Sequence, residues 1–272
     1  MTSDILQLEI AGIGVALTIT DPGMIARVRE HYADFIVAAG QPQVNVEVKT
    51  IPGARFVPER PGPWVIETQL EKNHLTYRSY FDAGWVDLER RVGGLETAPE
   101  ADLENFLRVL YAHLCLRHGG LLLHASGVVK GQAGYVFFGA SGNGKTTVAQ
   151  LSLGLGYIVL SDDLVILKTS GDQCRVFGVP FRGTLPEAPR TNAVGNLTGL
   201  FALAKDTRHY LVEMSKSRAV SRLAACAPFV MTEPAHAGQV MKICAELATR
   251  VPVRELHFSR DAGFWEVIHE PN

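Results

Sequence analysis

The chain has 272 residues, enough for one large domain or two modest ones. Hydrophobic residues make up 47% and charged residues 20%, the balance of a folded globular protein rather than a disordered one. The net charge of −2 gives no reason to expect a nucleic-acid partner, because nucleic-acid-binding domains are usually basic. No apolar run of about 18 residues and no export signal is recognisable, so we expect a cytoplasmic protein without a membrane partner.

The first third of the chain is patterned as strands. Apolar residues alternate with polar ones over residues 6–10, 15–19 and 44–48, which is the period of a half-buried strand. Further strands are predicted at 64–69 and 74–81, and a helix from the N-cap Asp21 to about Phe35. None of these residues forms a chemical motif. The sequence therefore predicts a smaller, strand-rich α+β domain over residues 1–98, with substrate docking as its expected role.

Residues 99–272 are predicted to form a second domain, introduced by a helix over 100–117 that ends at Gly119 and Gly120. The hydrophobic patterns there alternate between strands and helices, which is typical of an α/β fold. The strands are expected at 121–123, 127–130, 134–138, 157–160, 164–168, 174–177 and 253–258, and the helices at 145–153, 217–225 and 236–250.

Residues 139–146 read GASGNGKT, a full match to the P-loop pattern GxxxxGK[ST]. The glycines let successive backbone N–H groups turn inward around phosphate oxygens, and the helix that follows adds the positive end of its dipole. In this pattern Lys145 reaches the β- and γ-phosphates of ATP and the Thr146 hydroxyl binds Mg²⁺. The predicted nucleotide-binding residues are Gly139, Ala140, Ser141, Gly142, Asn143, Gly144, Lys145, Thr146 and Thr147.

Two acidic residues, Asp162 and Asp163, follow the strand predicted at 157–160. If that strand is the parallel neighbour of 134–138, both carboxylates lie beside the phosphates, where one holds Mg²⁺ and the other faces an incoming nucleophile. The alternative is an ordinary polar turn. His124 precedes a predicted hairpin whose second strand leads into the glycine loop, so we expect the imidazole at the same site, although a lone histidine at a strand end often has no catalytic role.

In their order along the chain, HASG at 124–127, GASGNGKT at 139–146 and SDD at 161–163 resemble the catalytic domain of the HPr kinase/phosphorylase family. That family is similar in its nucleotide-binding core to the phosphoenolpyruvate carboxykinases. The specific motifs cover residues 119–185, and weaker patterns at 178–183 and 251–258 resemble HPr-kinase-related proteins of unassigned substrate. The resemblance implies an α/β P-loop core of this type, and a homo-oligomer, because the family forms closed oligomers.

The resemblance also implies roles for single residues. Asp162 would be the base that accepts the proton of a serine hydroxyl, Asp163 would hold the metal together with Thr146, and His124 would support Asp162. The family's acidic residue before the arginine of a Glu-x-Arg-Gly stretch is missing here, so we do not expect the reverse phosphorylase reaction. The remaining Arg182 is predicted to stabilise the transferred phosphate, and an ordinary exposed arginine is the alternative.

Together these features predict an ATP-dependent kinase that uses Mg²⁺ and transfers the γ-phosphoryl group to a hydroxyl. The expected acceptor is a serine or threonine of a peptide or protein. One alternative is a kinase of a small molecule such as a free amino acid. Another is a regulatory protein that binds ATP without catalysis. The presence of Asp162, Asp163 and His124 favours catalysis, because a protein that only binds nucleotide needs the loop and one acid.

Overall fold

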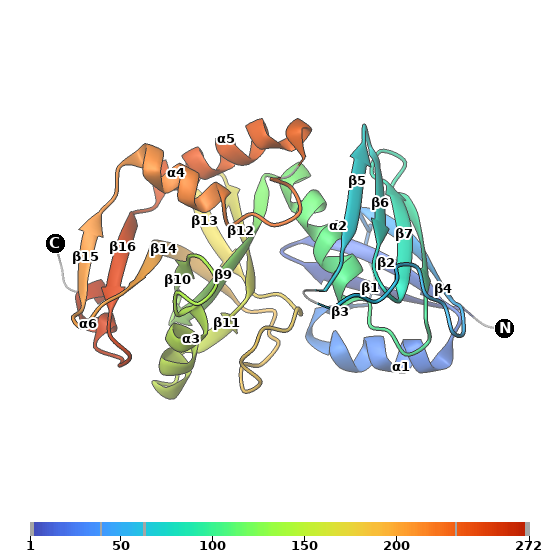
Figure 1. Ribbon diagram of the computed structural model, residues 1–272, viewed down its shortest axis with the longest axis horizontal. Helices are drawn as coiled ribbons and strands as arrows, with labels where there is room; N and C mark the ends of the chain where they lie inside the picture. The colour runs from blue at the N-terminus through green and yellow to red at the C-terminus, as the bar shows by residue number, and fades with distance from the viewer. Residues whose placement is uncertain (1–2, 39, 62–63, 232, 270–272) are drawn as a thin grey trace. The chain divides into compact units, whose positions relative to one another are not determined.

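The computed structural model describes residues 3–38, 40–61, 64–231 and 233–269 (Figure 1). The chain divides into two compact units, residues 1–114 and 115–272, each built around an eight-stranded sheet. Both sheets mix parallel and antiparallel strands and carry helices, which confirms the expected α/β character. The division falls within helix α2 (Glu104–Arg117), further along the chain than the boundary expected after residue 98.

Unit 1 holds one sheet with strand order β3-β1-β2-β4-β8-β7-β6-β5. Strands β2, β4 and β8 are parallel to one another, and the other neighbours are antiparallel. The strands are β1 (Asp4–Ile10), β2 (Ile13–Ile19), β3 (Ile36–Val37), β4 (Val44–Thr50), β5 (Glu67–Glu71), β6 (His74–Arg78), β7 (Asp82–Asp87) and β8 (Val92–Thr97). Helix α1 (Pro22–His31) is followed by the 3₁₀ turn η1 (Ala33–Phe35).

Local sequence rules account for these elements. Val44, Val46 and Val48 of β4 are all buried while the residues between them are exposed, as period-two alternation requires. The Asp21 side chain accepts a hydrogen bond from the Met24 N–H at 2.6 Å and so caps α1, which confirms the predicted helix start. The helix ends at His31, earlier than expected, because the chain tightens into the 3₁₀ turn η1, which runs to Phe35.

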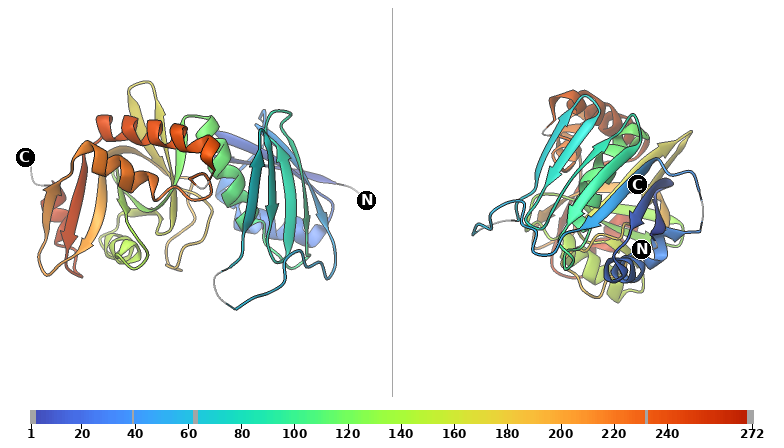
Figure 2. Two further views of the ribbon diagram at one scale, coloured as in Figure 1. Left: turned by 45° about the horizontal axis from the view of Figure 1, so that its top comes forward. Right: turned by 90° about the vertical axis from the view of Figure 1, so that its right-hand side faces the viewer.

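Unit 2 contains eight further strands and four helices after α2 among the described residues. The strands are β9 (Gly120–Lys130), β10 (Ala133–Phe138), β11 (Ile158–Ser161), β12 (Leu164–Ser170), β13 (Gln173–Phe177), β14 (Val194–Lys205), β15 (Tyr210–Glu213) and β16 (Val253–Phe258). The helices are α3 (Lys145–Gly154), α4 (Lys216–Ala224), α5 (Pro234–Arg250) and α6 (Phe264–His269). Helices α4 and α5 lie side by side on one face of the sheet, and α3 lies on the other (Figures 1 and 2).

The strand path of unit 2 closes on itself. β10 pairs with β9, β9 with β12, β12 with β13, and β13 with β14, which returns to pair with β10. β10, β14 and β16 are parallel, so their carboxyl ends meet at one edge. The expected pairing of 157–160 with 134–138 was wrong: β11 pairs with β9, because the β9–β10 hairpin inserts β9 between them.

The core of unit 2 beneath α3 and α6 is aromatic. The rings of Phe137 and Phe201 stack with centroids 5.5 Å apart, and Phe264 and Trp265 of α6 pack edge-on against Phe137. All four side chains are at most 5% exposed. Aromatic contacts of this kind stabilise by roughly 0.5–1.5 kcal/mol each beyond the area they bury. They fix β10, and therefore the start of the glycine loop, against β14.

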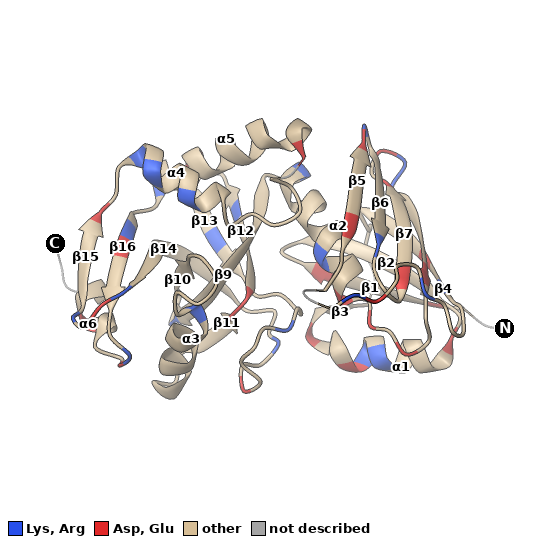
Figure 3. Ribbon diagram, in the orientation of Figure 1, with Lys and Arg blue, Asp and Glu red and all other residues tan. Residues whose placement is uncertain are grey.

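No helix in the described part of the chain is long and apolar enough to cross a membrane. Lysine and arginine are interspersed with aspartate and glutamate over both units, with α4 the most basic helix (Figure 3). The two arginines of α4, Arg218 and Arg222, both contact Glu255 of β16.

Among the described residues of unit 1, one carboxyl group is buried. Asp82 is 4% exposed and its Oδ1 accepts a hydrogen bond from the Tyr77 hydroxyl at 3.0 Å. Burial raises the pKa of Asp82 from its ordinary value of 3.8 to about 7, because the charged form loses its hydration, while the Tyr77 hydrogen bond partly offsets this. The carboxyl group of Asp82 therefore holds its proton more tightly in the native protein than in the unfolded chain.

We predict that Asp82→Asn removes a pH-dependent cost of folding. With a raised pKa in the native state, the contribution of Asp82 to stability is present below pH 3.8 and is lost as the pH rises towards about 7. Urea denaturation across that range should show wild type losing up to about 4 kcal/mol relative to the variant. A difference in unfolding free energy that stays constant with pH would contradict the raised pKa.

Candidate functional site

Two other segments of unit 2, the glycine loop and the acidic pair, converge on His124 of β9. In the β9–β10 pair Ala125 lies opposite Phe138, so His124 lies opposite the start of the glycine loop, residues 139–144. In the β9–β12 pair His124 lies opposite Leu164, which directly follows the two acidic residues. The hairpin geometry thus brings the histidine, the glycine loop and the acidic pair together, although the parallel pairing expected to do so is absent.

The glycine loop connects β10 to α3 and is tightly packed. Gly144 has a φ of 101°, a left-handed conformation that favours glycine. A Cβ there would come within 2.6 Å of the Phe258 ring, so a side chain cannot be accommodated without moving that ring. Asn143 donates a side-chain hydrogen bond to the Leu203 carbonyl at 3.2 Å, which ties the loop to the end of β14.

Lys145, the first residue of α3, is only 7% exposed. Its Nζ donates to the carbonyl oxygens of Gly139 at 3.1 Å and Ala140 at 3.4 Å, so the amine lies over the loop. Burial lowers the pKa of Lys145, while the nearby carboxyl groups of Asp163 and Asp162 oppose that effect. The arrangement places one cation next to the first turn of a helix, where anions bind favourably.

Asp162 is 3% exposed and is held almost entirely through Oδ2. That oxygen accepts hydrogen bonds from the hydroxyls of Thr146 and Thr184, both at 2.9 Å, and from the backbone N–H groups of Thr184 at 3.1 Å and Leu185 at 3.2 Å. The two threonine hydroxyls are themselves 3.0 Å apart. Thr146, Asp162 and Thr184 form an oxygen cluster that joins α3, β11 and the segment after Arg182.

Gly183 completes this cluster from the other side. A Cβ on Gly183 would lie 1.7 Å from Oδ1 of Asp162, so the carboxylate occupies the space that any other residue would need. Gly183 falls within the weak sequence pattern at 178–183, whereas Thr184 is not among the predicted site residues. Nothing in the local sequence marks Thr184, because a threonine after an Arg-Gly pair is an ordinary loop residue.

His124 contacts Asp163 and not Asp162, contrary to the expected support of Asp162. Its Nε2 lies 3.1 Å from Oδ1 of Asp163, and the two side chains are 44% and 28% exposed. The cause is the turn at Ser161, whose hydroxyl accepts the N–H groups of Asp163 and Leu164, each at 3.1 Å. The turn directs Asp162 towards α3 and Asp163 towards β9. The polar turn that the sequence offered as an alternative to the acidic pair is therefore present, and it is what orients the two carboxylates.

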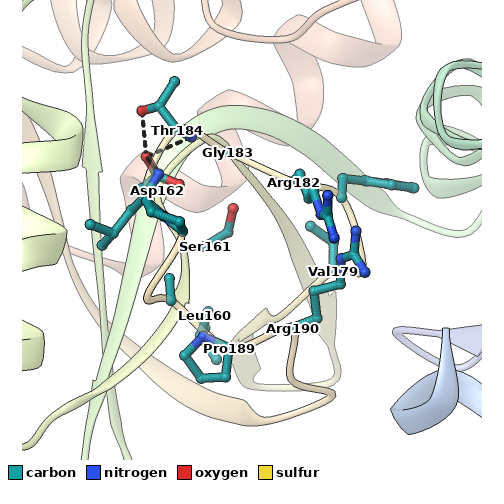
Figure 4. Close-up of a pocket in the computed structure, with 13 residues that line it drawn as sticks. Leu160, Ser161, Asp162, Val179, Arg182, Gly183, Thr184, Pro189 and Arg190 are labelled. Carbon is teal, nitrogen blue, oxygen red and sulfur yellow. Dashed lines mark hydrogen bonds between the residues drawn. The ribbon is translucent and has the colours of Figure 1, made fainter. Parts of the chain in front are cut away.

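These residues line a cavity of about 450 Å³, called here the phosphate cavity. It gathers most of the predicted site, together with Thr184, on one surface: His124, Ser141, Gly142, Gly144, Lys145, Thr146, Thr147, Asp162, Asp163 and Thr184. Gly139, Ala140 and Asn143 lie in the loop but do not line it. Arg182 lies elsewhere, on a second cavity of about 480 Å³ that shares Asp162 and Thr184 with the first (Figure 4).

Within the described residues, no three His, Cys, Asp or Glu side chains gather in the manner of a metal site built from protein alone. Mg²⁺ does not require one, since it usually takes one or two carboxylates plus phosphate oxygens and water. The oxygen cluster fits such an ion, because Thr146 and Asp162 already place a hydroxyl and a carboxylate oxygen 2.9 Å apart beside the glycine loop. No protein-family model matches the chain, and no curated protein sequence matches it.

Proposed function

We propose that this chain is an ATP-dependent phosphotransferase, built on a P-loop core, that moves the γ-phosphoryl group of ATP to a hydroxyl. The observation that carries the proposal is the convergence in one cavity of a glycine loop, a lysine at a helix start and two carboxylates with different partners. A protein that only binds nucleotide needs no second carboxylate with its own histidine. The resemblance to the HPr kinase/phosphorylase family adds support from the sequence.

In the proposed complex, the N–H groups of the glycine loop and the Lys145 amine bind the phosphates. Thr146 and Asp162 would hold Mg²⁺, which when bound neutralises charge on the phosphates during transfer. Asp162 suits this role because its Oδ2 already contacts the Thr146 hydroxyl. This assignment reverses the one predicted from the sequence, where Asp163 held the metal.

We assign the role of general base to Asp163. Asp162 is buried in the oxygen cluster and only 3% exposed, so it is poorly placed to reach the hydroxyl of an acceptor. Asp163 is more exposed and is oriented by His124 at 3.1 Å. In the transfer step Asp163 takes the hydroxyl proton, the acceptor oxygen bonds to the γ-phosphorus, and the bond to the β,γ-bridging oxygen breaks, its electron pair leaving with ADP.

The proposal is tested first by binding. Lys145→Ala should weaken binding of a non-hydrolysable ATP analogue with Mg²⁺ by at least about tenfold, because charge-assisted hydrogen bonds to phosphate are lost. Lys216→Ala, an exposed lysine of α4, is the matched control and should bind as wild type. Calorimetric titration decides. An analogue that does not bind wild type, or that binds wild type and Lys145→Ala equally, removes the P-loop assignment.

A second titration, with Mg²⁺, should distinguish the roles of the two aspartates. Asp162→Asn should raise the Mg²⁺ concentration needed for analogue binding by about tenfold or more. Asp163→Asn should leave that concentration unchanged and lower transfer of labelled phosphate to acceptors by about 10²–10⁴-fold, the usual worth of a general base. Acceptors are found by screening γ-labelled ATP against hydroxyl-bearing peptides and small molecules. The opposite pattern would restore Asp162 as the base.

A further inference from the structure

The second cavity, called here the arginine cavity, lies against the end of β11 and the segment from Val179 to Arg190. Its volume is about 480 Å³, within the range of pockets that bind small molecules. It shares Asp162 and Thr184 with the phosphate cavity, so the two cavities meet at the oxygen cluster. A molecule in the arginine cavity would therefore lie next to the phosphates of the proposed nucleotide.

Two cations lie across this cavity from the oxygen cluster. Figure 4 shows Arg182 and Arg190 on one side of the cavity and Asp162 with Thr184 on the other. A guanidinium group recognises carboxylate or phosphate through paired N–H donors, and two on one wall match one anionic group.

The remaining lining favours this chemistry. Among the described residues that line the cavity, Asp162 is the only acid, and its Oδ2 is already bonded to Thr146, Thr184 and Leu185. Much of the rest of the wall is apolar, with Leu160, Val179 and Phe181 buried, so the local dielectric is low and a charge pair is stronger than in water. Pro186 and Pro189 limit the freedom of the segment and hold it in shape.

We propose that the arginine cavity binds the anionic group of the phosphate acceptor, a small hydroxyl compound that carries a carboxylate or a phosphate ester. This inference rests on the phosphotransferase function proposed above and names its substrate class. The acceptor is anchored by Arg182 and Arg190 and extends past Asp162 and Thr184, so that its hydroxyl enters the phosphate cavity beside Asp163. Arg182 then acts on the acceptor and not on the transferred phosphate.

The test is a titration with inorganic phosphate of the full chain, saturated beforehand with the Mg²⁺ complex of a non-hydrolysable ATP analogue. The analogue occupies the glycine loop, so further phosphate binding reports on another site. Wild type should bind phosphate, and Arg182→Ala and Arg190→Ala should each weaken that binding at least about tenfold, as loss of a charge-assisted contact does. Arg175→Ala, an exposed arginine of β13 that lines neither cavity, is the control and should leave it unchanged.

Competition then identifies the anion. Glycerate and glycerol phosphate share a carbon skeleton with neutral glycerol, and at least one of the two should displace phosphate while glycerol does not. The better competitor shows whether carboxylate or phosphate ester is preferred. The inference is overturned if wild type does not bind phosphate, if the arginine variants bind it as tightly as wild type, or if glycerol displaces it. In each of these cases binding of the analogue leaves the proposed function intact. Failure of the analogue to bind rejects both.

Discussion

The hydrogen bonds accepted by Oδ2 of Asp162 are the contacts on which the rest of the site depends. Through this one oxygen the start of α3, the end of β11 and the segment after Arg182 are held together, by Thr146, Thr184 and Leu185. A buried carboxylate needs such donors, because leaving it unsatisfied costs several kcal/mol. Gly183 lies so close to the other carboxylate oxygen that it leaves no room for a side chain, which shows how tightly the chain is fitted around Asp162.

The strand order of unit 2 places the segments that contact Asp162 and Asp163 on either side of β9. β9 lies between β10 and β11, and His124 on it lies opposite the glycine loop in one direction and Leu164 in the other. Asp162 and Asp163 are therefore neighbours in sequence with separate partners. In the proposed mechanism this separation lets one carboxylate hold the metal while the other, next to His124, takes a proton. It also places Asp162 and Thr184 on the border between the phosphate and arginine cavities.

Local patterns predicted much of the fold. β4, β16 and the β12–β13 hairpin lie where alternation and turn residues indicate, and α3 begins at Lys145 as the glycine pattern requires. The long strand β14 was missed, since its pairing with β10, β13 and β16 comes from distant segments that no local period encodes. The sequence also led us to expect His124 beside Asp162, whereas its imidazole lies against Asp163, because the hydrogen bonds of the Ser161 turn decide which way each aspartate side chain points. Thr184 reaches the site only through tertiary structure.

The most direct test of this account is the Mg²⁺ dependence of ATP-analogue binding in Thr184→Val and Thr184→Ser. Valine keeps the shape of threonine and removes the hydroxyl that donates to Asp162 and lies 3.0 Å from the Thr146 hydroxyl. If the oxygen cluster organises the metal site, the valine variant should need about tenfold more Mg²⁺, as expected for loss of one hydrogen bond to a charged group, and the serine variant should bind as wild type. A valine variant with the Mg²⁺ requirement of wild type would contradict the central role of the cluster.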